Sequence, residues 1–441
     1  MQTRFSPRQL ENPDLRESEK ILRACVHCGF CLATCPTYLE LGDELDSPRG
    51  RIYLIKDMLE NDKPASAQVT KHVDRCLSCL SCMTTCPSGV HYMHLVDYAR
   101  VRIAETYRRP WADRILRAIL ARVLPSPALF RLSLKVARLA RPFAALLPGR
   151  MRAMIEIAPG SLPASLPGNA PARFAAEGPR RMRVALLPGC VQPVLSPAIN
   201  AATVRLLARH GIEVVIAGNA GCCGALVHHL GRRDEALASA RANIAAWSAL
   251  LKEGPLDAIV INAAGCGTMV KDYGFLMRDD PQFAEAAARI SGLARDVSEI
   301  IRAVGLKAAK PPRMLAVAYH SACSLQHGQK LHDVGRDLLR AAGFETSDVP
   351  DGHLCCGSAG TYNLLEPELA AGLAQRKAAA IERIAPDVVA AGNIGCIVQI
   401  GRVLARPVVH TVELLDWATG GPCPPALGNS AAGGKCGRDR K

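Results

Sequence analysis

Two four-cysteine runs near the amino end constrain this chain more than any other feature of its sequence. Each run has the spacing C-x2-C-x2-C-x3-C and is followed by proline. The first comprises Cys25, Cys28, Cys31 and Cys35, and the second comprises Cys76, Cys79, Cys82 and Cys86. A cubane cluster needs four thiolates, and this spacing is typical of proteins that hold two of them. Structural zinc sites use pairs of cysteines instead. The runs therefore predict two [4Fe–4S] clusters.

The fourth cysteine of each run is expected to serve the other cluster, as in two-cluster ferredoxins. We assign cluster 1 to Cys25, Cys28, Cys31 and Cys86, and cluster 2 to Cys76, Cys79, Cys82 and Cys35. Between the runs, SPRGRIYLIKDMLE predicts an amphipathic helix, so the domain at residues 21–108 should be mainly α-helical. Arg49 and Arg51, at the start of that helix, either bias the cluster potentials or lie in solvent. His27 is expected to be a loop residue rather than a ligand.

A second set of cysteines repeats along the rest of the chain. Cys190, Cys222, Cys223 and Cys266 recur as Cys323, Cys355, Cys356 and Cys396, with offsets of 133 residues at three positions and 130 at the fourth. This match predicts two duplicated domains, at residues 181–310 and 311–418.

Within each repeat, apolar runs alternate with helical segments, as in RVALL, EVVIA and DAIVI of the first repeat. This alternation predicts an α/β fold with a parallel sheet. The cysteines follow the strands, whose carboxyl ends meet at one edge of the sheet, so four thiols should converge in each repeat. They either hold a further iron–sulfur cluster or zinc ion, or are buried or redox-active thiols. His320 and His327, on either side of Cys323, are candidate metal ligands or ordinary polar residues.

The segment between the two regions is strongly basic. The whole chain has a formal net charge of +14, and residues 100–152 contain 13 Arg or Lys but only two acidic residues. Apolar and basic residues alternate there at helical spacing, and Pro125 and Pro127 divide the segment into two short helices. Such helices suit an anionic membrane surface or a partner protein, and no nucleic-acid motif accompanies them. The arginines expected on this face are Arg114, Arg117, Arg122, Arg131 and Arg138.

The remaining segments suggest connections. Residues 1–20 are a polar lead-in without the apolar stretch of a signal peptide, so a reducing compartment is expected. Residues 109–180 end in a Pro- and Gly-rich linker. Residues 419–441 have the composition of a disordered tail, and their Cys423 and Cys436 are assigned to no site. No apolar run reaches 18 residues, so we expect no transmembrane helix. Neither a P-loop nor a G-x-G-x-x-G motif occurs, so a flavin is expected on a partner chain and no residue here is assigned a catalytic role.

Two resemblances follow from these motifs. The repeats, with Cys222, Cys223 and Gly224 in one and Cys355, Cys356 and Gly357 in the other, resemble the cysteine-rich CCG domains of heterodisulfide reductase and its relatives. They depart from that motif because Met269 and Gln399 replace its last cysteine. Together with the cluster runs, NAGCCGALVHHL, HLCCGSAGTYNLL and NIGC resemble the glycolate oxidase iron–sulfur subunit family.

This resemblance implies the electron-transfer subunit of a flavin-dependent complex. One or more FAD-binding subunits would oxidise glycolate to glyoxylate, or D-lactate in its place, and pass electrons to this chain. The chain would deliver them to the quinone of the inner membrane, from its cytoplasmic side. Alternatives are the same role with glycerol 3-phosphate or L-lactate, or a thiol redox protein of the heterodisulfide reductase type.

Overall fold

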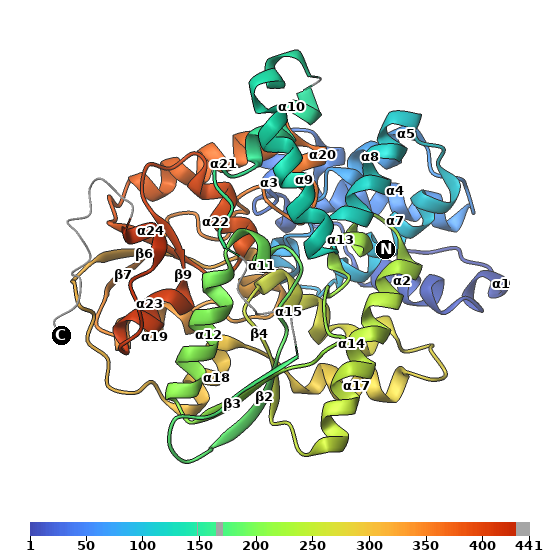
Figure 1. Ribbon diagram of the computed structural model, residues 1–441. Helices are drawn as coiled ribbons and strands as arrows, with labels where there is room; N and C mark the ends of the chain where they lie inside the picture. Colours follow the sequence, from blue (N-terminus) through green and yellow to red (C-terminus); the bar gives the residue numbers. More distant parts are fainter. Residues whose placement is uncertain (148, 165–170, 429–441) are drawn as a thin grey trace.

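The computed structural model describes residues 1–147, 149–164 and 171–428. The chain begins with a helical module (blue in Figure 1), in which α2 (Pro13–Ala24), α4 (Pro48–Glu60), α5 (Ala67–Asp74) and α7 (Tyr92–Thr106) enclose an apolar core that includes Leu22, Ile55 and Leu95. Ser47 caps α4 by accepting a hydrogen bond from the backbone N–H of Gly50, and Pro48 takes the first helical position. The helix predicted from SPRGRIYLIKDMLE is therefore confirmed.

Shorter elements complete the module between these helices. They are α1 (Pro7–Leu10), the 3-10 turn η1 (Phe30–Leu32), α3 (Pro36–Leu41), the 3-10 turn η2 (Glu44–Asp46) and α6 (Ser81–Thr85).

The first repeat contains a five-stranded sheet of order β1-β3-β2-β4-β5. Its strands are β1 (Ala172–Phe174), β2 (Met182–Leu186), β3 (Ile212–Ile216), β4 (Ala258–Ile261) and β5 (Ala294–Asp296). All pairs are parallel except β1 with β3. β1 lies in the stretch that the sequence predicted as linker: Phe174 packs against the core, and pairing with β3 makes it a short edge strand. The helices of the first repeat are α11 (Gln192–Leu195), α12 (Pro197–Arg209), α13 (Ala225–His229), α14 (Arg233–Glu253), α15 (Ala264–Lys271), α16 (Tyr273–Leu276), α17 (Ala284–Leu293) and α18 (Val297–Val304).

The second repeat has the same plan in a four-stranded, fully parallel sheet of order β7-β6-β8-β9. The strands are β6 (Ala316–His320), β7 (Glu345–Asp348), β8 (Val388–Ala391) and β9 (Val408–His410). The helices are α19 (Val334–Ala341), α20 (Tyr362–Leu365), α21 (Pro367–Glu382), α22 (Ile394–Gly401) and α23 (Thr411–Ala418), with a π-helical turn η4 (Ser324–Gly328). The predicted fold class, a helical module followed by duplicated parallel α/β domains, is confirmed. Within the predicted tail, α24 (Pro425–Gly428) is helical, whereas residues 429–441, including Cys436, lie outside the described residues.

The two repeats share one apolar core, which contains strands of both sheets and the facing helices α12 and α23. Polar contacts reinforce this interface. Arg205 and Arg209 of α12 both form ion pairs with the buried carboxylate of Asp416 on α23. His410 Nε2 donates a hydrogen bond to the carbonyl of Asn262, 2.8 Å away. The repeats are therefore one packed unit.

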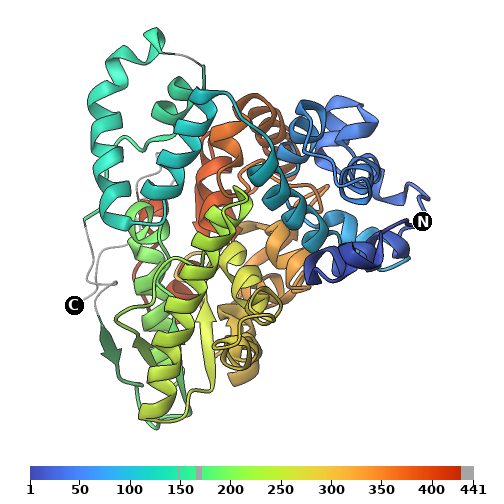
Figure 2. The same cartoon turned by 90° about the vertical axis from the view of Figure 1, so that its right-hand side faces the viewer.

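The basic segment forms α8 (Trp111–Val123), α9 (Pro127–Ala140), the 3-10 turn η3 (Arg141–Leu146) and α10 (Gly149–Ile157), which stand together along one side of the molecule (cyan to teal in Figure 2). The break between α8 and α9 falls at the predicted prolines. One face buries Leu120, Phe130 and Leu134, but the other leaves apolar side chains exposed. These are Trp111, Ile115, Ile119, Leu129, Leu132, Val136, Leu139, Phe143, Leu146 and Met151. Within the described residues, no helix combines the length and apolarity needed to cross a membrane.

Candidate metal centres

The first predicted ligand set surrounds one small cavity at the surface. Cys25 ends α2, Cys31 lies in η1, and Cys86 follows α6 at the end of the second run. These three thiols and Cys28 all line the same cavity. Cys28 is exposed, so this cavity lies close to solvent.

The second predicted set surrounds a deeper cavity. Cys35, Cys76, Cys79 and Cys82 line it, together with Arg51. Cys82 borders both cavities, so the two are adjacent. The structure thus brings together the thiols of each predicted set, including the exchange of the fourth cysteine between the two runs.

The loops of the two runs share an unusual backbone. His27 and Gly29, on either side of Cys28, have φ of 57° and 85°, and Ser78 and Leu80, on either side of Cys79, have φ of 48° and 63°. Left-handed backbone is costly for a side chain such as leucine. Its recurrence at matching positions shows that both runs form the same turn around their second cysteine, Cys28 or Cys79.

The chemistry of the thiols fits an iron–sulfur cluster. Burial raises the pKa of Cys31 to about 11, and it raises the pKa of Cys79 and Cys82 well above the usual value. Thiolates are therefore unfavourable in these cavities unless a positive charge is present. The iron of a bound cluster supplies that charge, because a coordinating thiol is deprotonated by its metal.

Arg51 contributes a buried positive charge beside the second cavity. Its side chain is 1% exposed, and its Nη1 lies 3.8 Å from Cys35 Sγ. The guanidinium also donates to the carbonyl of His72 and the hydroxyl of Thr37, and it pairs with Asp46. Of the two alternatives for this arginine, the structure supports an electrostatic effect on the site rather than a solvated helix start.

Arg49 is in a different position. It pairs with Glu44 at 2.7 Å, donates to the carbonyl of His27 and remains one-third exposed. Its charge is therefore screened by solvent, unlike that of the buried Arg51.

The cysteines of each repeat follow the carboxyl ends of the strands, as predicted. Cys190 follows β2, Cys222 and Cys223 follow β3, and Cys266 lies in α15 just after β4. Hydrogen bonds from Cys190 and Cys223 lower the pKa of Cys222 to about 4.

In the second repeat, Cys323 follows β6, Cys355 and Cys356 follow β7, and Cys396 lies in α22 after β8. The Sγ atoms of Cys323 and Cys355 are 3.9 Å apart.

An apolar cavity of about 620 Å³ joins these two groups to the amphipathic helices. Seven of the eight repeat thiols line it, all except Cys222, and so do Leu120, Leu134 and Met154 of α8, α9 and α10. The cavity therefore extends from the cysteines to the helices that carry the exposed apolar side chains.

The positions that depart from the CCG motif have structural roles. Met269 is buried in the core of the first repeat. Gln399 is buried and donates to the carbonyl of Ala370, while accepting from Asn363. Neither can replace the missing thiolate.

The helical module contacts the second repeat directly at its cysteines. Cys79 of the second run and Cys355 lie in one buried cluster with Leu77 and Tyr362. The second cavity of the module is thus next to the thiols of repeat two.

Two residues that organise the second run were missed from the sequence. Arg100 on α7 donates to the carbonyl of Cys76 and the hydroxyl of Ser78, both at 2.6 Å. It pairs with Asp97, which also contacts His228 of the first repeat. Burial raises the pKa of Asp97, but His228 and His229 outweigh that effect and hold it well below the usual value. The signal available in the sequence was the spacing of Asp97 and Arg100, an oppositely charged pair at i and i+3 on one helix.

The five arginines predicted for an external face do not all lie there. Arg114, Arg122 and Arg138 are exposed. Arg117 instead forms ion pairs with Asp74 and Asp113 and is largely buried, so its assignment to the face is corrected. Arg131 is half-buried and donates to the carbonyl of Pro163.

Comparison with known proteins agrees with this organisation. Residues 21–90 match the 4Fe-4S dicluster domain family, and residues 184–271 and 317–401 each match the cysteine-rich domain family. The glycolate oxidase iron–sulfur subunit of Escherichia coli K12 is 44% identical over 95% of this chain and 99% of its own length. The chain belongs to the glycolate oxidase iron–sulfur subunit family.

Other relatives fit this family at lower identity. A probable glycolate oxidase iron–sulfur subunit of Bacillus subtilis is 31% identical over 95% of the chain and 99% of its own length. Lactate utilization protein A of Bacillus licheniformis is 26% identical over 53% of the chain and 99% of its own length. A crystal structure of a hypothetical protein from Helicobacter pylori shares the fold, with a TM-score of 0.53 at 10% identity over 93% of this chain and 73% of that one. The predicted family and its iron–sulfur cofactors are confirmed.

Proposed function

We propose that this chain carries electrons from the flavin of a partner subunit to the membrane quinone during the oxidation of glycolate to glyoxylate. The main support for this proposal is the order in which the thiol groups lie from the surface to the second repeat. The exposed Cys28 marks a cavity near the surface, Cys82 is shared with the deeper cavity, and Cys79 packs with Cys355 of the second repeat. Bound [4Fe–4S] clusters supply one-electron carriers at these positions.

The residues of the chain arrange this route. The left-handed turns at Leu80 and Gly29 hold the loops around the cavities. The guanidinium of Arg51 provides a fixed positive charge beside the ligands of cluster 2, and this charge favours the reduced state of that cluster. Cys79 and Cys355 lie in one buried apolar cluster at the boundary with the second repeat.

The membrane end of the route is supported by helices α8–α10. Exposed side chains such as Trp111, Leu139 and Leu146 form an apolar surface, and Arg114, Arg122 and Arg138 are exposed on the same helices. An apolar helical face with arginines suits the boundary between acyl chains and anionic headgroups. The apolar cavity beneath it is of the size that accommodates a small organic molecule, which suits a quinone ring.

Glycolate as the substrate of the complex is supported by the name of the 44% identical relative. D-lactate, which is also a 2-hydroxy acid, is the alternative substrate. The names of the lactate utilization relatives, which match about half of the chain, support lactate less strongly and do not distinguish D-lactate from L-lactate. The names of the relatives reported above refer to neither glycerol 3-phosphate nor heterodisulfide reduction.

The test is anaerobic co-purification of the chain with its partners, followed by counts of iron and acid-labile sulfide and by assay of glycolate-dependent quinone reduction. We expect about eight irons from the module. Cys28→Ser should remove one EPR signal and leave glycolate-dependent flavin reduction intact while quinone reduction is lost. Full quinone reduction by this variant would contradict the route, and loss of flavin reduction as well would point to a failure of assembly.

A further inference from the structure

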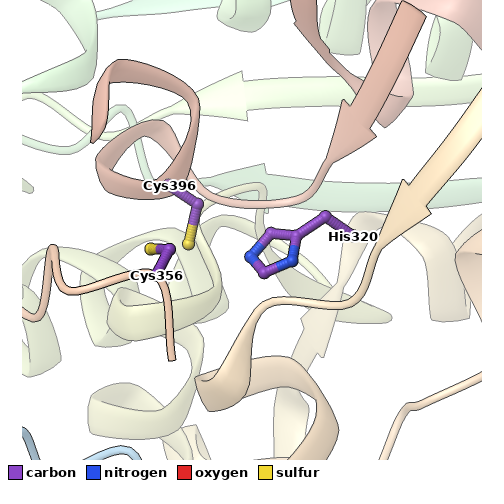
Figure 3. A group of neighbouring side chains, drawn as sticks. All are labelled: His320, Cys356 and Cys396. Carbon is purple, nitrogen blue, oxygen red and sulfur yellow. The ribbon is translucent and has the colours of Figure 1, made fainter. Parts of the chain in front are cut away.

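Three potential metal ligands of the second repeat converge at a place separate from both cavities of the helical module. His320 is the last residue of β6, Cys356 follows β7, and Cys396 lies in the first turn of α22. One imidazole nitrogen and the two Sγ atoms all lie within 4.8 Å of one another. Figure 3 shows the imidazole ring turned toward the two cysteines.

His320 is the unusual member of this group. It is 1% exposed, and neither of its ring nitrogens has a hydrogen-bond partner. A buried polar group without a partner is costly, on the order of 1–3 kcal/mol. A ligand that accepts the lone pair of the imidazole accounts for a histidine in this position.

One other group of three potential ligands is equally close among the described residues. It comprises Asp43, Asp46 and His72. Its central carboxylate, Asp46, already pairs with Arg51 and Arg75. The group of Asp43, Asp46 and His72 is therefore part of a structural ion-pair network. No ion pair accounts in the same way for the group of His320, Cys356 and Cys396 among the described residues.

The spacing of the donors suits a single ion. With Zn–S bonds of about 2.3 Å and Zn–N bonds of about 2.0 Å, the donors of a tetrahedral site are about 3.5–3.8 Å apart. The three donors here need to close by at most about 1 Å. Ligands of a cubane cluster bind separate irons at different corners and have no need to be this close together.

The surroundings also match a zinc site. Two thiolates and an imidazole are ligands that zinc prefers. Asn393 Nδ2 donates to Cys396 Sγ at 3.6 Å, which is the kind of outer contact that orients a metal ligand. Cys356 and Cys396 line the apolar cavity of about 620 Å³, so a fourth coordination position borders that space.

The first repeat provides an internal comparison. Cys223 and Cys266 correspond to Cys356 and Cys396, but the residue three before Cys190 is Leu187, whereas the residue three before Cys323 is His320. Leu187 is buried, and no third donor joins the two thiols within the same distance among the described residues of that repeat. The duplicated domains therefore differ at the position that would complete the site.

We propose that His320, Cys356 and Cys396 bind one mononuclear Zn²⁺ in the second repeat, with the fourth position open toward the cavity. This set differs from the four-thiol centre predicted from the sequence, because it includes His320 and leaves Cys323 and Cys355 as a separate pair. The proposal does not depend on the substrate or the acceptor of the complex.

The experiment measures zinc, iron and acid-labile sulfide in the full chain, purified without oxygen from zinc-supplemented medium and dialysed against a weak chelator. We expect about one zinc per chain in addition to the cluster iron. His320→Leu reproduces the natural residue of the first repeat, so it should fold, and it should lose the zinc while iron and sulfide stay unchanged. His320→Cys should retain zinc, because a third thiolate can replace the imidazole.

Cys266→Ser in the first repeat is the matched control for Cys396→Ser. Only the second substitution should remove zinc. Replacement of zinc by Co²⁺ should give the intense thiolate-to-cobalt absorption of a site with two sulfur ligands, and His320→Leu should abolish it. Absence of zinc from the wild-type chain, zinc retained in His320→Leu, or loss of iron instead of zinc in these variants would each overturn the proposal.

Discussion

Thr84 of the second cysteine run and His327 of the second repeat are joined by a hydrogen bond, with 2.8 Å between Thr84 Oγ1 and His327 Nδ1. The other ring nitrogen of His327 lies 3.1 Å from the carbonyl of His353, to which it donates. Burial lowers the pKa of His327. The Thr84 hydroxyl also donates a hydrogen bond to the carbonyl of Ser81 at 3.0 Å, so the same side chain contacts its own helix and the second repeat. This contact is one of several that join the helical module to the repeats.

Thr84→Val should weaken that boundary. The substitution removes the hydroxyl that contacts Nδ1 of His327, and loss of a buried hydrogen bond costs about 1 kcal/mol. Anaerobic denaturation should show the loss, and limited proteolysis should cleave faster between the module and the repeats. Thr85→Val is the control, because the Thr85 hydroxyl contacts only Thr34 of the module. Equal behaviour of the two variants would show that the contact carries no stability.

Arg51→Gln should lower the reduction potential of cluster 2, whose predicted ligands include Cys35. The variant removes a buried positive charge whose Nη1 is 3.8 Å from Cys35 Sγ, and an added electron is then less stabilised. We expect a decrease of several tens of millivolts, where about 59 mV equals a tenfold change in a one-electron equilibrium. Redox titration followed by EPR measures it. Arg49→Gln, at an exposed ion pair, should change either potential much less, and the opposite ranking would refute the role of Arg51.

Substitution of Arg114, Arg122 and Arg138 by Gln together should weaken binding to anionic vesicles. These exposed arginines add about 1 kcal/mol each near a charged membrane surface, and salt should screen the effect. Vesicle co-sedimentation at low and high ionic strength measures the change.

Arg117→Gln should behave differently. This arginine pairs with Asp74 and Asp113, so its loss should reduce stability rather than vesicle binding. Vesicle binding that is insensitive to the triple substitution and to salt would argue for a protein partner on this face.

His410 should make the stability of the repeats depend on pH. Burial lowers the pKa of His410 to about 4, whereas an unfolded histidine titrates near its usual 6.5. The neutral form is favoured in the folded chain, so stability is full above pH 6.5 and falls as the pH drops toward 4. The expected loss between pH 7.5 and 5.5 is about 1.4 kcal/mol.

His410→Asn keeps an N-cap side chain for α23 but removes this titration. Denaturant unfolding of both proteins at the two pH values gives the comparison. A wild-type loss no larger than that of the variant would exclude His410 as the origin.

Much of the fold followed from periodicity and from the cysteine spacing. The match of four cysteines between repeats implied equivalent sheets, whose strand ends should bring the thiols of each repeat together. In the structure, Cys190 lies beside Cys222, and Cys323 lies beside Cys355. β1 was missed because three residues in a Pro- and Gly-rich stretch carry almost no pattern, and their strand exists only through pairing with β3. Tertiary pairing of this kind cannot be read from local sequence.

The sites were predictable in composition but not in detail. Spacing grouped the eight cysteines of the module, whereas the buried positions of Arg51 and Arg100 depend on how α4 and α7 pack. Arg117 has the same helical spacing as its exposed neighbours, and only the approach of Asp74 from α5 places it inside. His320 was noticed as a strand end, yet its lack of partners became evident only in three dimensions.

The common core of the two repeats has a consequence for shortened versions of this chain. A fragment that stops between the repeats would present the apolar side of α12 to water, and the charges of Arg205 and Arg209 would lose Asp416. Such a fragment should aggregate rather than act as a minimal electron carrier. Each repeat therefore depends on the other to cover its apolar surface.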